Sequence, residues 1–494
     1  MTATVDRTAP PDLAASEASA VVRRRWTGFA VVITAMILNI LDSTILNVAA
    51  PSIQRDLGAS ASAIEWIAAS YTLAIAVGLL TGGRLGDRYG RRTMLLLGLT
   101  GFLVASVACA SAWSPGSLIA ARVVQGLSAA LLTPQTFGLI RDLFPPDQIG
   151  KAFAAFGPII GLSTVAGPIV AGSLIQLDPF GADWRSLFLI NVPFGLFALA
   201  VGHRVLPAGV SKPSIRLDLV GTGLIGAASF LLVFPLVDGR SLGWPVWLFA
   251  AMAAAVPLLA VFVAQQRRRT RRGTTPLVEF SVLAKRSYVS GVAFTLSFFG
   301  AITGFSLTLG LFLQVGLGFT AMHAALYLVA MSVGAVVGSG VGAWAATAVG
   351  RPILHVGLSI MAVGVEVLLV SLAHSGAMPG AGALLPGLAV VGTGMGMIFV
   401  PLFSIITGEI EDHEVGSASA VLESLQQLGS SLGVAVLATL FFSRLALEHG
   451  GPRAALAAGR HLGAVEATLW ATLVMLGISF ALGWLLPRRA RTGA

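Results

Sequence analysis

The sequence predicts an all-α integral membrane protein, and three observations support this fold class. Hydrophobic residues make up 56% of the 494-residue chain and charged residues only 11%, against about 25% charged in an ordinary soluble protein. The mean hydropathy is +0.87. The apolar residues also come in blocks of about 20, the length of a helix that crosses a hydrocarbon core of about 30 Å. These observations exclude a soluble globular protein.

Reading the apolar blocks between polar hinges predicts fourteen spans. They lie at about 28–50, 63–82, 93–113, 117–140, 152–176, 186–206, 217–237, 244–265, 288–314, 322–347, 352–373, 381–407, 415–443 and 464–487. With both termini in the cytoplasm, 24 of the 31 lysines and arginines fall on the inner side and six on the outer side. The positive-inside rule therefore predicts cytoplasmic termini and a multi-pass protein of the cell membrane.

A faint internal repeat predicts how the spans are grouped. The hinge GGRLGDRYGRR at 82–92 is similar to the later hinge GVGAWAATAVGRP at 340–352. Two parallel six-helix bundles with two inserted helices would produce this spacing, an arrangement found in transporters whose substrate site lies between the bundles. The predicted parts are a disordered tail at 1–25, an N-terminal bundle at 26–206, an inserted pair with a basic loop at 207–287, a C-terminal bundle at 288–487 and a tail at 488–494.

Charged side chains inside the predicted spans are candidate functional residues, because each costs at least about 2.5–3.5 kcal/mol at membrane depth. The acids well inside spans are Asp42, Glu366 and Glu423, and the basic residue is Arg122. The alternative for each is a buried hydrogen bond or ion pair that only holds helices together. We favour that alternative for Glu366, and for Glu423 both interpretations stay open.

Polar residues share a helix face with three of these four charges. At 100° per residue the three stripes fall within about 140°, 80° and 60° of arc. They are Asn39, Asp42, Ser43 and Asn47 in the first span; Arg122, Gln125, Thr133 and Thr136 in the fourth; and Ser419, Glu423, Gln426 and Ser430 in the thirteenth. A carboxyl that faces water and is then occluded binds and releases protons. The stripes therefore predict a proton-coupling device.

Several function classes are excluded. The net charge of +9 resides in the hinges between spans, without a nucleic-acid recognition pattern, so we expect no nucleic-acid partner. The single cysteine, Cys109, permits neither an intrachain disulfide nor a thiolate metal cluster. None of Lys151, Lys212 and Lys285 precedes Ser or Thr, so the chain has no phosphate loop for ATP. We expect no enzyme activity, no metal and no cofactor.

Six segments resemble the fourteen-span drug:proton antiporters of the QacA/EmrB type, a branch of the major facilitator superfamily. They are LDSTILNVAAP (41–51), the G-x-L-x-D-R-x-G-R-R hinge (83–92), RVVQG (122–126), GPIVAG (167–172), WRSLFLINVPFG (184–195) and PLVEFSVLAKRSY (276–288). The resemblance covers nearly the whole chain. It implies the major facilitator fold and the export of hydrophobic cationic or neutral drugs, driven by the proton gradient alone.

The resemblance also implies roles for individual residues. The proton-coupling and substrate site would comprise Asp42, Arg122 and Glu423, with Asn39, Gln125 and Gln426 on the same stripes. A conformational latch would comprise Gly83, Asp87, Arg88, Gly90, Arg91 and Arg92. The antiporter motif, with Gly157, Gly161, Gly167, Pro168 and Gly172, would form a bend that prevents leak; from periodicity alone these glycines equally indicate static close packing. The second hinge lacks an acid, so we expect only the first to latch.

The predicted partners are a small hydrophobic substrate, protons and the lipid bilayer, and we expect a monomer. An alternative within transport is a narrow-specificity carrier for a metabolite or a self-made antibiotic, because a fold does not set its substrate. A receptor, scaffold or channel would have little use for charged stripes in separate spans.

Overall fold

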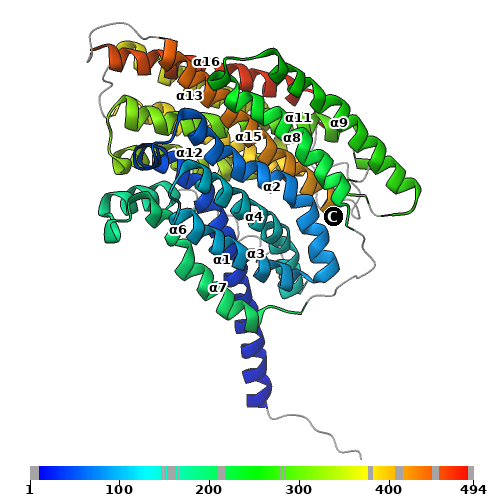
Figure 1. Cartoon of the computed structure of the whole chain (residues 1–494). Helices are drawn as coiled ribbons and strands as arrows, with labels where there is room; N and C mark the ends of the chain where they lie inside the picture. Colours follow the sequence, from blue (N-terminus) through cyan, green and yellow to red (C-terminus); the bar gives the residue numbers. More distant parts are fainter. Residues whose placement is uncertain are drawn as a thin grey trace, which may run out of the picture.

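The computed structural model describes residues 11–145, 148, 152, 163, 166–208, 217–274, 276–278, 281–282, 285–375, 382–406, 415–447 and 455–487. These residues are almost entirely helical, and no strand occurs among them (Figure 1). The first helices are α1 (Pro11–Leu57), α2 (Ala61–Tyr89), α3 (Arg91–Ala110), α4 (Pro115–Leu143), a helix at Ala166–Leu177, α6 (Ser186–Leu189) and α7 (Asn191–Val205). We refer to these together as the N-terminal bundle.

Two helices, α8 (Leu219–Leu242) and α9 (Val246–Arg271), form the inserted pair. The C-terminal bundle consists of α11 (Arg286–Leu311), the π-helical turn η3 (Phe312–Gly316), α12 (Ala321–Val349), α13 (Pro352–Ser375), α14 (Leu385–Ile406), α15 (Val415–Leu447) and α16 (Ala455–Gly483).

Thirteen helices among the described residues are long and apolar enough to cross a membrane. Each overlaps one of the fourteen predicted spans. The remaining prediction, at 152–176, overlaps the apolar helix Ala166–Leu177, which is shorter than a span, and most of the residues before it lie outside those described. The all-α membrane fold is thus confirmed, whereas the fourteenth span, the bundle boundaries and the cytoplasmic termini stay predictions.

Local sequence signals set the helix ends in the N-terminal bundle. The Ser60 hydroxyl caps the start of α2. Ser114 and Ser117 form a reciprocal capping box at the start of α4. A single residue, Gly90, joins α2 to α3 with φ of +94°, a conformation that glycine adopts without steric strain. The resulting tight hairpin fixes the predicted latch at one end of the bundle.

The hinge at 340–352 is built like the hinge at 82–92. In each, an arginine follows a positive-φ glycine and reaches the last helix of its own bundle. Arg92 donates to the carbonyl of His203 near the end of α7. Arg351 donates to the carbonyl of Trp484, just beyond α16, over 2.8 Å. The two similar hinge sequences thus form the same local structure, a glycine turn followed by an arginine that donates to a backbone carbonyl.

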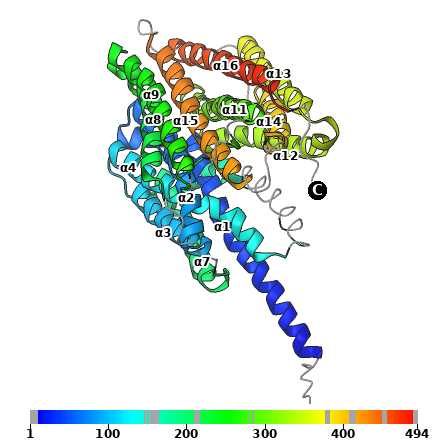
Figure 2. The ribbon, with the colours of Figure 1, turned by 90° about the vertical axis from the view of Figure 1, so that its right-hand side faces the viewer.

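The inserted pair packs against the outside of both bundles, because α8 lies along α2 and also contacts α15 (Figure 2). The Trp66 indole on α2 donates to the Asp238 carboxylate on α8 over 2.7 Å. Further along the two antiparallel helices, the hydroxyls of Thr81 and Thr222 are hydrogen-bonded at 2.6 Å. The pair therefore lies over the line where α2 and α15 meet, which we call the seam.

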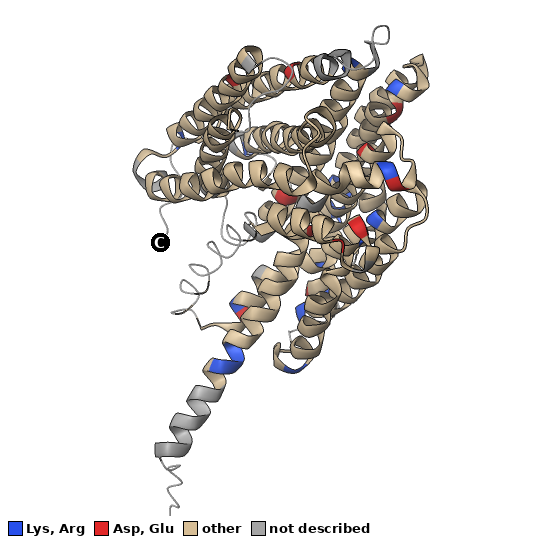
Figure 3. Cartoon of the chain, turned by 90° about the vertical axis from the view of Figure 1, so that its left-hand side faces the viewer, with Lys and Arg blue, Asp and Glu red and all other residues tan. Residues whose placement is uncertain are grey.

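The C-terminal bundle carries few charged side chains (Figure 3) and is held by close contact between helix backbones. A Cβ on Gly338 of α12 would lie 2.0 Å from the Thr393 carbonyl oxygen of α14. A Cβ on Gly392 of α14 would lie 1.8 Å from the Met331 carbonyl oxygen of α12. Because no side chain separates these backbones, dispersion forces act at minimal distance. Gly338 and Gly392 are therefore packing residues.

We expect Gly338→Ala to destabilise the protein by about 1–3 kcal/mol, because its Cβ would meet backbone atoms that cannot move aside independently. Gly340→Ala is the matched control: it lies on the same helix with nothing within 4 Å of its added Cβ. Thermal unfolding of the detergent-purified variants measures both effects. Gly340→Ala should equal or slightly exceed the parent, since alanine favours helix over glycine. Equal unfolding midpoints for the two variants would contradict the packing account.

Candidate functional site

A buried ion pair joins α1 and α4 inside the N-terminal bundle. Asp42 is 0% exposed and Arg122 is 1% exposed. The Arg122 guanidinium donates to one carboxylate oxygen of Asp42. It also donates to Oε1 of Gln125 over 2.9 Å, and Nε2 of Gln125 donates to the other Asp42 oxygen over 2.8 Å. Asp42, Arg122 and Gln125 thus form a closed triangle of hydrogen bonds between α1 and α4.

A second layer of polar groups surrounds this triangle. Ser106 on α3 accepts from Gln125 over 3.0 Å and from Asn191 on α7 over 3.2 Å. Asn191 also donates to Asp42 over 3.5 Å, while its own side-chain oxygen has no partner among the described residues. Burying a carboxylate and a guanidinium is tolerated only where their remaining lone pairs and protons are matched. The second layer provides that matching for Asp42.

The predicted residue Asn39 connects the triangle to α2. The Tyr71 hydroxyl donates to Asn39 Oδ1 over 3.0 Å, and Asn39 Nδ2 donates to the Thr133 hydroxyl over 2.8 Å. The Tyr71 ring also lies under the guanidinium of Arg122, with 3.9 Å from Cζ to the ring centroid. A desolvated cation over an aromatic face gains about 2 kcal/mol or more. Tyr71 thus stabilises the Arg122 guanidinium both when Asp42 is ionised and when Asp42 is neutral.

Three residues of this network, Tyr71, Ser106 and Asn191, were not predicted from the sequence. Each is a single polar residue on an otherwise apolar face, so none produced a stripe. Asn191 lies inside the segment WRSLFLINVPFG, which was recognised only as recurring in the family. An amide within an apolar span is a signal of the same kind as a charge, because it too needs a buried partner.

The other two predicted site residues, Glu423 and Gln426, are not part of this network. Both lie half-buried on α15, and no described residue pairs with the Glu423 carboxylate. The next residue, Ser424, donates its hydroxyl proton to the Ala76 carbonyl of α2. Glu423 therefore lies beside the seam between the bundles. Glu366 is exposed on α13, so the buried hydrogen bond or ion pair that we favoured for it from the sequence is wrong.

The predicted latch lies at the end of α2, in the one-residue turn and at the start of α3. Its members are Gly83, Asp87, Arg88, Gly90, Arg91 and Arg92. Arg91 donates to both carboxylate oxygens of Asp142 on α4, over 3.1 and 3.2 Å. Both side chains are about one-third exposed, so the pair contributes at most about 1 kcal/mol. A contact of this strength breaks and re-forms readily, as a latch requires.

Arg84, Gly86 and Gln135 support the latch and were not predicted. A Cβ on Gly86 would lie 1.9 Å from Oε1 of Gln135 on α4, so this glycine lets the two helices approach. Nε2 of Gln135 donates to the carbonyl of Gly82 over 2.9 Å. Arg84 donates to the carbonyl of Pro276 over 3.1 Å, which connects the latch to the loop that follows the inserted pair.

The antiporter motif is described only in part, because Gly157 and Gly161 lie outside the described residues. Gly167, Pro168 and Gly172 lie in the helix Ala166–Leu177. A Cβ on Gly172 would lie 2.9 Å from Cα of Met322 on α12. This helix of the N-terminal bundle therefore touches the backbone of the C-terminal bundle, a contact that needs a glycine.

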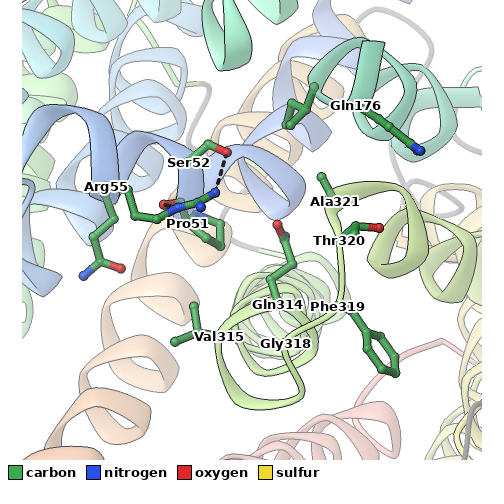
Figure 4. A pocket seen from close by; sticks show the side chains of 12 residues that line it. Pro51, Ser52, Arg55, Gln176, Gln314, Val315, Gly318, Phe319, Thr320 and Ala321 are labelled. Carbon is green, nitrogen blue, oxygen red and sulfur yellow. Dashed lines mark hydrogen bonds between the residues drawn. The ribbon is translucent and has the colours of Figure 1, made fainter. Parts of the chain in front are cut away.

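A cavity of about 630 Å³ lies between the two bundles where α1 ends and α12 begins (Figure 4). Its lining includes Ser52 and Arg55 of α1 and Gln314 of η3. Arg55 donates to the Ser52 hydroxyl over 3.3 Å, and Gln314 donates to the Val48 carbonyl over 2.9 Å. The Gln314 bond holds this end of η3 against α1, so the bundles touch here around the cavity.

Comparisons with known proteins agree with this architecture. Residues 32–434 match the Major Facilitator Superfamily. A protein named as a probable actinorhodin transporter from Streptomyces coelicolor is 46% identical over 85% of this chain and 73% of its own length. The tetracenomycin C resistance and export protein of Streptomyces glaucescens is 33% identical over 88% of this chain and 79% of its own. A crystal structure of an auto-inhibited peptide transporter of the POT family, 16% identical, superposes with a TM-score of 0.66 over 95% of this chain and 98% of that one. This chain is a member of the major facilitator superfamily.

Proposed function

We propose that this protein exports hydrophobic antibiotics or drugs, neutral or cationic, across the cell membrane in exchange for protons. The observation that carries the proposal is the buried Asp42–Arg122 pair, an ionisable pair inside a membrane bundle. The names of relatives such as the tetracenomycin C resistance and export protein support the substrate class and the direction. Two bundles that meet at a seam support alternating access around an interfacial site.

In the proposed cycle, substrate enters from the cytoplasmic side and lies between the bundles near Glu423. This carboxyl is half-buried beside the seam and has no cationic partner among the described residues, so it suits a substrate cation. The bundles then rock, and an external proton neutralises Asp42 or Glu423 and releases the substrate. The protein returns with the proton and discharges it inside.

Protonation of Asp42 supplies a physical link between proton and conformation. The carboxylate and the guanidinium of Arg122 balance each other in a site without water contact. A proton on Asp42 leaves Arg122 as a buried cation, at a cost of about 3–5 kcal/mol. The bundle avoids that cost by rearranging so that Arg122 gains water or another acceptor.

The proton gradient is sufficient for efflux. A charge that crosses 100 mV yields about 2.3 kcal/mol, and a tenfold concentration ratio costs about 1.4 kcal/mol. One proton at about 150 mV therefore sustains roughly a 300-fold gradient of a neutral substrate.

A second candidate is export of a single compound rather than of many. The name of the 46% identical relative, a probable actinorhodin transporter, mentions one compound. We therefore include actinorhodin as well as lipophilic cations in the transport test.

We expect Asp42→Asn to abolish proton-coupled export, because asparagine cannot carry the proton. Inverted vesicles energised acid-inside, with a pH-sensitive dye, should show proton release when a substrate is added to the parent. The signal should fall to the level of vesicles that lack the protein. Glu366→Gln is the matched control, because it removes an exposed membrane-level carboxyl and should leave the signal intact. Unchanged export by Asp42→Asn would contradict the proposal of proton-coupled export through Asp42.

We expect Arg122→Gln to destabilise the protein by about 3–5 kcal/mol, because it strands the Asp42 carboxylate without a counter-ion. Adding Asp42→Asn to that variant should recover most of the stability, because no buried charge then remains, while export stays lost. Thermal unfolding of the single and double variants gives the coupling energy between the two sites. Additive losses would show that the two charges do not compensate each other.

A further inference from the structure

A second buried carboxyl, separate from Asp42, lies where three helices meet. Glu65 is on α2 in the N-terminal bundle and is 0% exposed. Thr439 of α15 in the C-terminal bundle places its hydroxyl 2.8 Å from Glu65 Oε2. Arg240 of α8 in the inserted pair places Nη2 3.8 Å from Glu65 Oε1. We call Glu65, Arg240 and Thr439, with Asp238 and Trp66 beside them, the junction.

The junction is one end of a row of hydroxyls along the seam. Ser424 and Ser431 of α15 donate to the backbone carbonyls of Ala76 and Ala69 of α2, the latter over 3.2 Å. These are side-chain bonds from one bundle to the other, and they lie between the start and the middle of α2, away from the latch. Parting of the bundles at this end must break them.

The hydrogen bonds at the junction are one proton short. The Thr439 hydroxyl lies 2.8 Å from Glu65 Oε2 and also 2.8 Å from the Leu236 carbonyl oxygen of α8. A hydroxyl has a single proton and donates to only one acceptor at a time. If Glu65 is ionised, one of these two close oxygen contacts has no proton. If Glu65 is protonated, it donates to Thr439, and Thr439 donates to Leu236.

The charges at the junction also favour a protonated Glu65. Two carboxyls, Glu65 and Asp238, and one guanidinium, Arg240, lie together, and the Asp238 carboxylate accepts from the Trp66 indole over 2.7 Å. With both acids ionised the junction carries one net negative charge, and one proton makes it neutral. At 3.8 Å, Arg240 is beyond hydrogen-bond distance from Glu65, and its Cζ lies over the Phe442 ring of α15 at 5.3 Å. Glu65 Oε1 has no hydrogen-bond partner among the described residues.

We propose that Glu65 is a proton-binding site that locks this end of the seam: the closed seam holds Glu65 protonated, and loss of the proton favours opening. An ionised Glu65 gains water when α15 moves away from α2, whereas a neutral one completes the hydrogen-bond chain through Thr439. The proposal rests on the proposed alternating access. It suits an exporter, because a proton arriving from outside then favours closure of the end through which the substrate has left.

The inserted pair has a defined part in this lock. It supplies Arg240, Asp238 and the Leu236 carbonyl, and therefore three of the groups that decide the charge and the hydrogen-bond count around Glu65. The antiparallel contacts of α8 with α2 continue to Thr222, so α8 moves with the N-terminal bundle and presents these groups to α15.

The test measures opening of the seam without any substrate. Cys109→Ser removes the native thiol, and Ser431→Cys, 0% exposed in the seam, reports opening by its reaction with a membrane-impermeant maleimide in intact cells. Trp113→Cys, 82% exposed in the parent, serves as the reference for the thiol's own pH dependence. Relative to this reference, labelling should rise about fivefold or more between external pH 5.5 and 8, as one to two kcal/mol of closure is lost.

Glu65→Gln should label slowly at every pH, because its amide donates to Thr439 as the protonated acid does. Glu366→Gln should keep the pH dependence of the parent. Thr439→Val should label fast at every pH, while Thr439→Ser should behave as the parent, which separates the hydroxyl from mere packing. The proposal is overturned if the parent shows no pH dependence, if Glu65→Gln keeps it, or if Thr439→Val stays closed.

This result and the transport result are independent. Loss of the pH-dependent labelling in Glu65→Gln, together with unchanged export by Asp42→Asn, would retain the lock and reject proton coupling at Asp42. The reverse outcome would retain coupling at Asp42 and reject the lock.

Discussion

The ion pair between Asp42 and Arg122 constrains the whole N-terminal bundle. Two charges excluded from water require partners for their remaining lone pairs and protons, and here those partners come from α1, α2, α4 and α7. Ser106 of α3 accepts from two of these partners, Gln125 and Asn191. A shift of one of these helices by a single turn would remove a hydrogen-bond partner. A buried polar or charged group would then lie against an apolar neighbour. The pair thus sets the register of five helices, and the latch arginines at the far end of α2 inherit their positions from it.

The C-terminal bundle follows a different physical rule. Its helices approach through glycines, such as Gly433 of α15, whose Cβ would lie 2.0 Å from the Gly300 carbonyl oxygen of α11. Contacts of this kind carry no net charge and require no specific partner atom, so their energy comes from dispersion. One bundle therefore holds the fixed charge pair, while the other presents a smooth apolar body with Glu423 at its edge.

The sequence was sufficient to place thirteen of the spans, because helix length and hydropathy are local properties. It was also sufficient for Asp42, Arg122 and Gln125, since each belongs to a polar stripe that one helix displays. Glu65 escaped notice for a physical reason: it is the third residue of the predicted span at 63–82, where a charge costs little. Its neighbours Asp238 and Arg240 fell beyond the predicted end of the span at 217–237, whereas α8 continues to Leu242. Burial of these groups arises only when three helices meet, which no single-helix pattern records.

The inserted pair takes part in the hydrogen bonds that must break when the bundles rock. Bonds from α8 to α2, through Asp238 and Thr222, join the pair to the N-terminal bundle. Among the described residues, the hydrogen bond that joins the pair to α15 is the one from the Thr439 hydroxyl to the Leu236 carbonyl, and the same hydroxyl contacts Glu65. Opening this end therefore separates Thr439 from two acceptors at once, and both acceptors stay together on the other side. The two acceptors share one hydroxyl proton. The energy of that separation therefore depends on whether Glu65 is protonated.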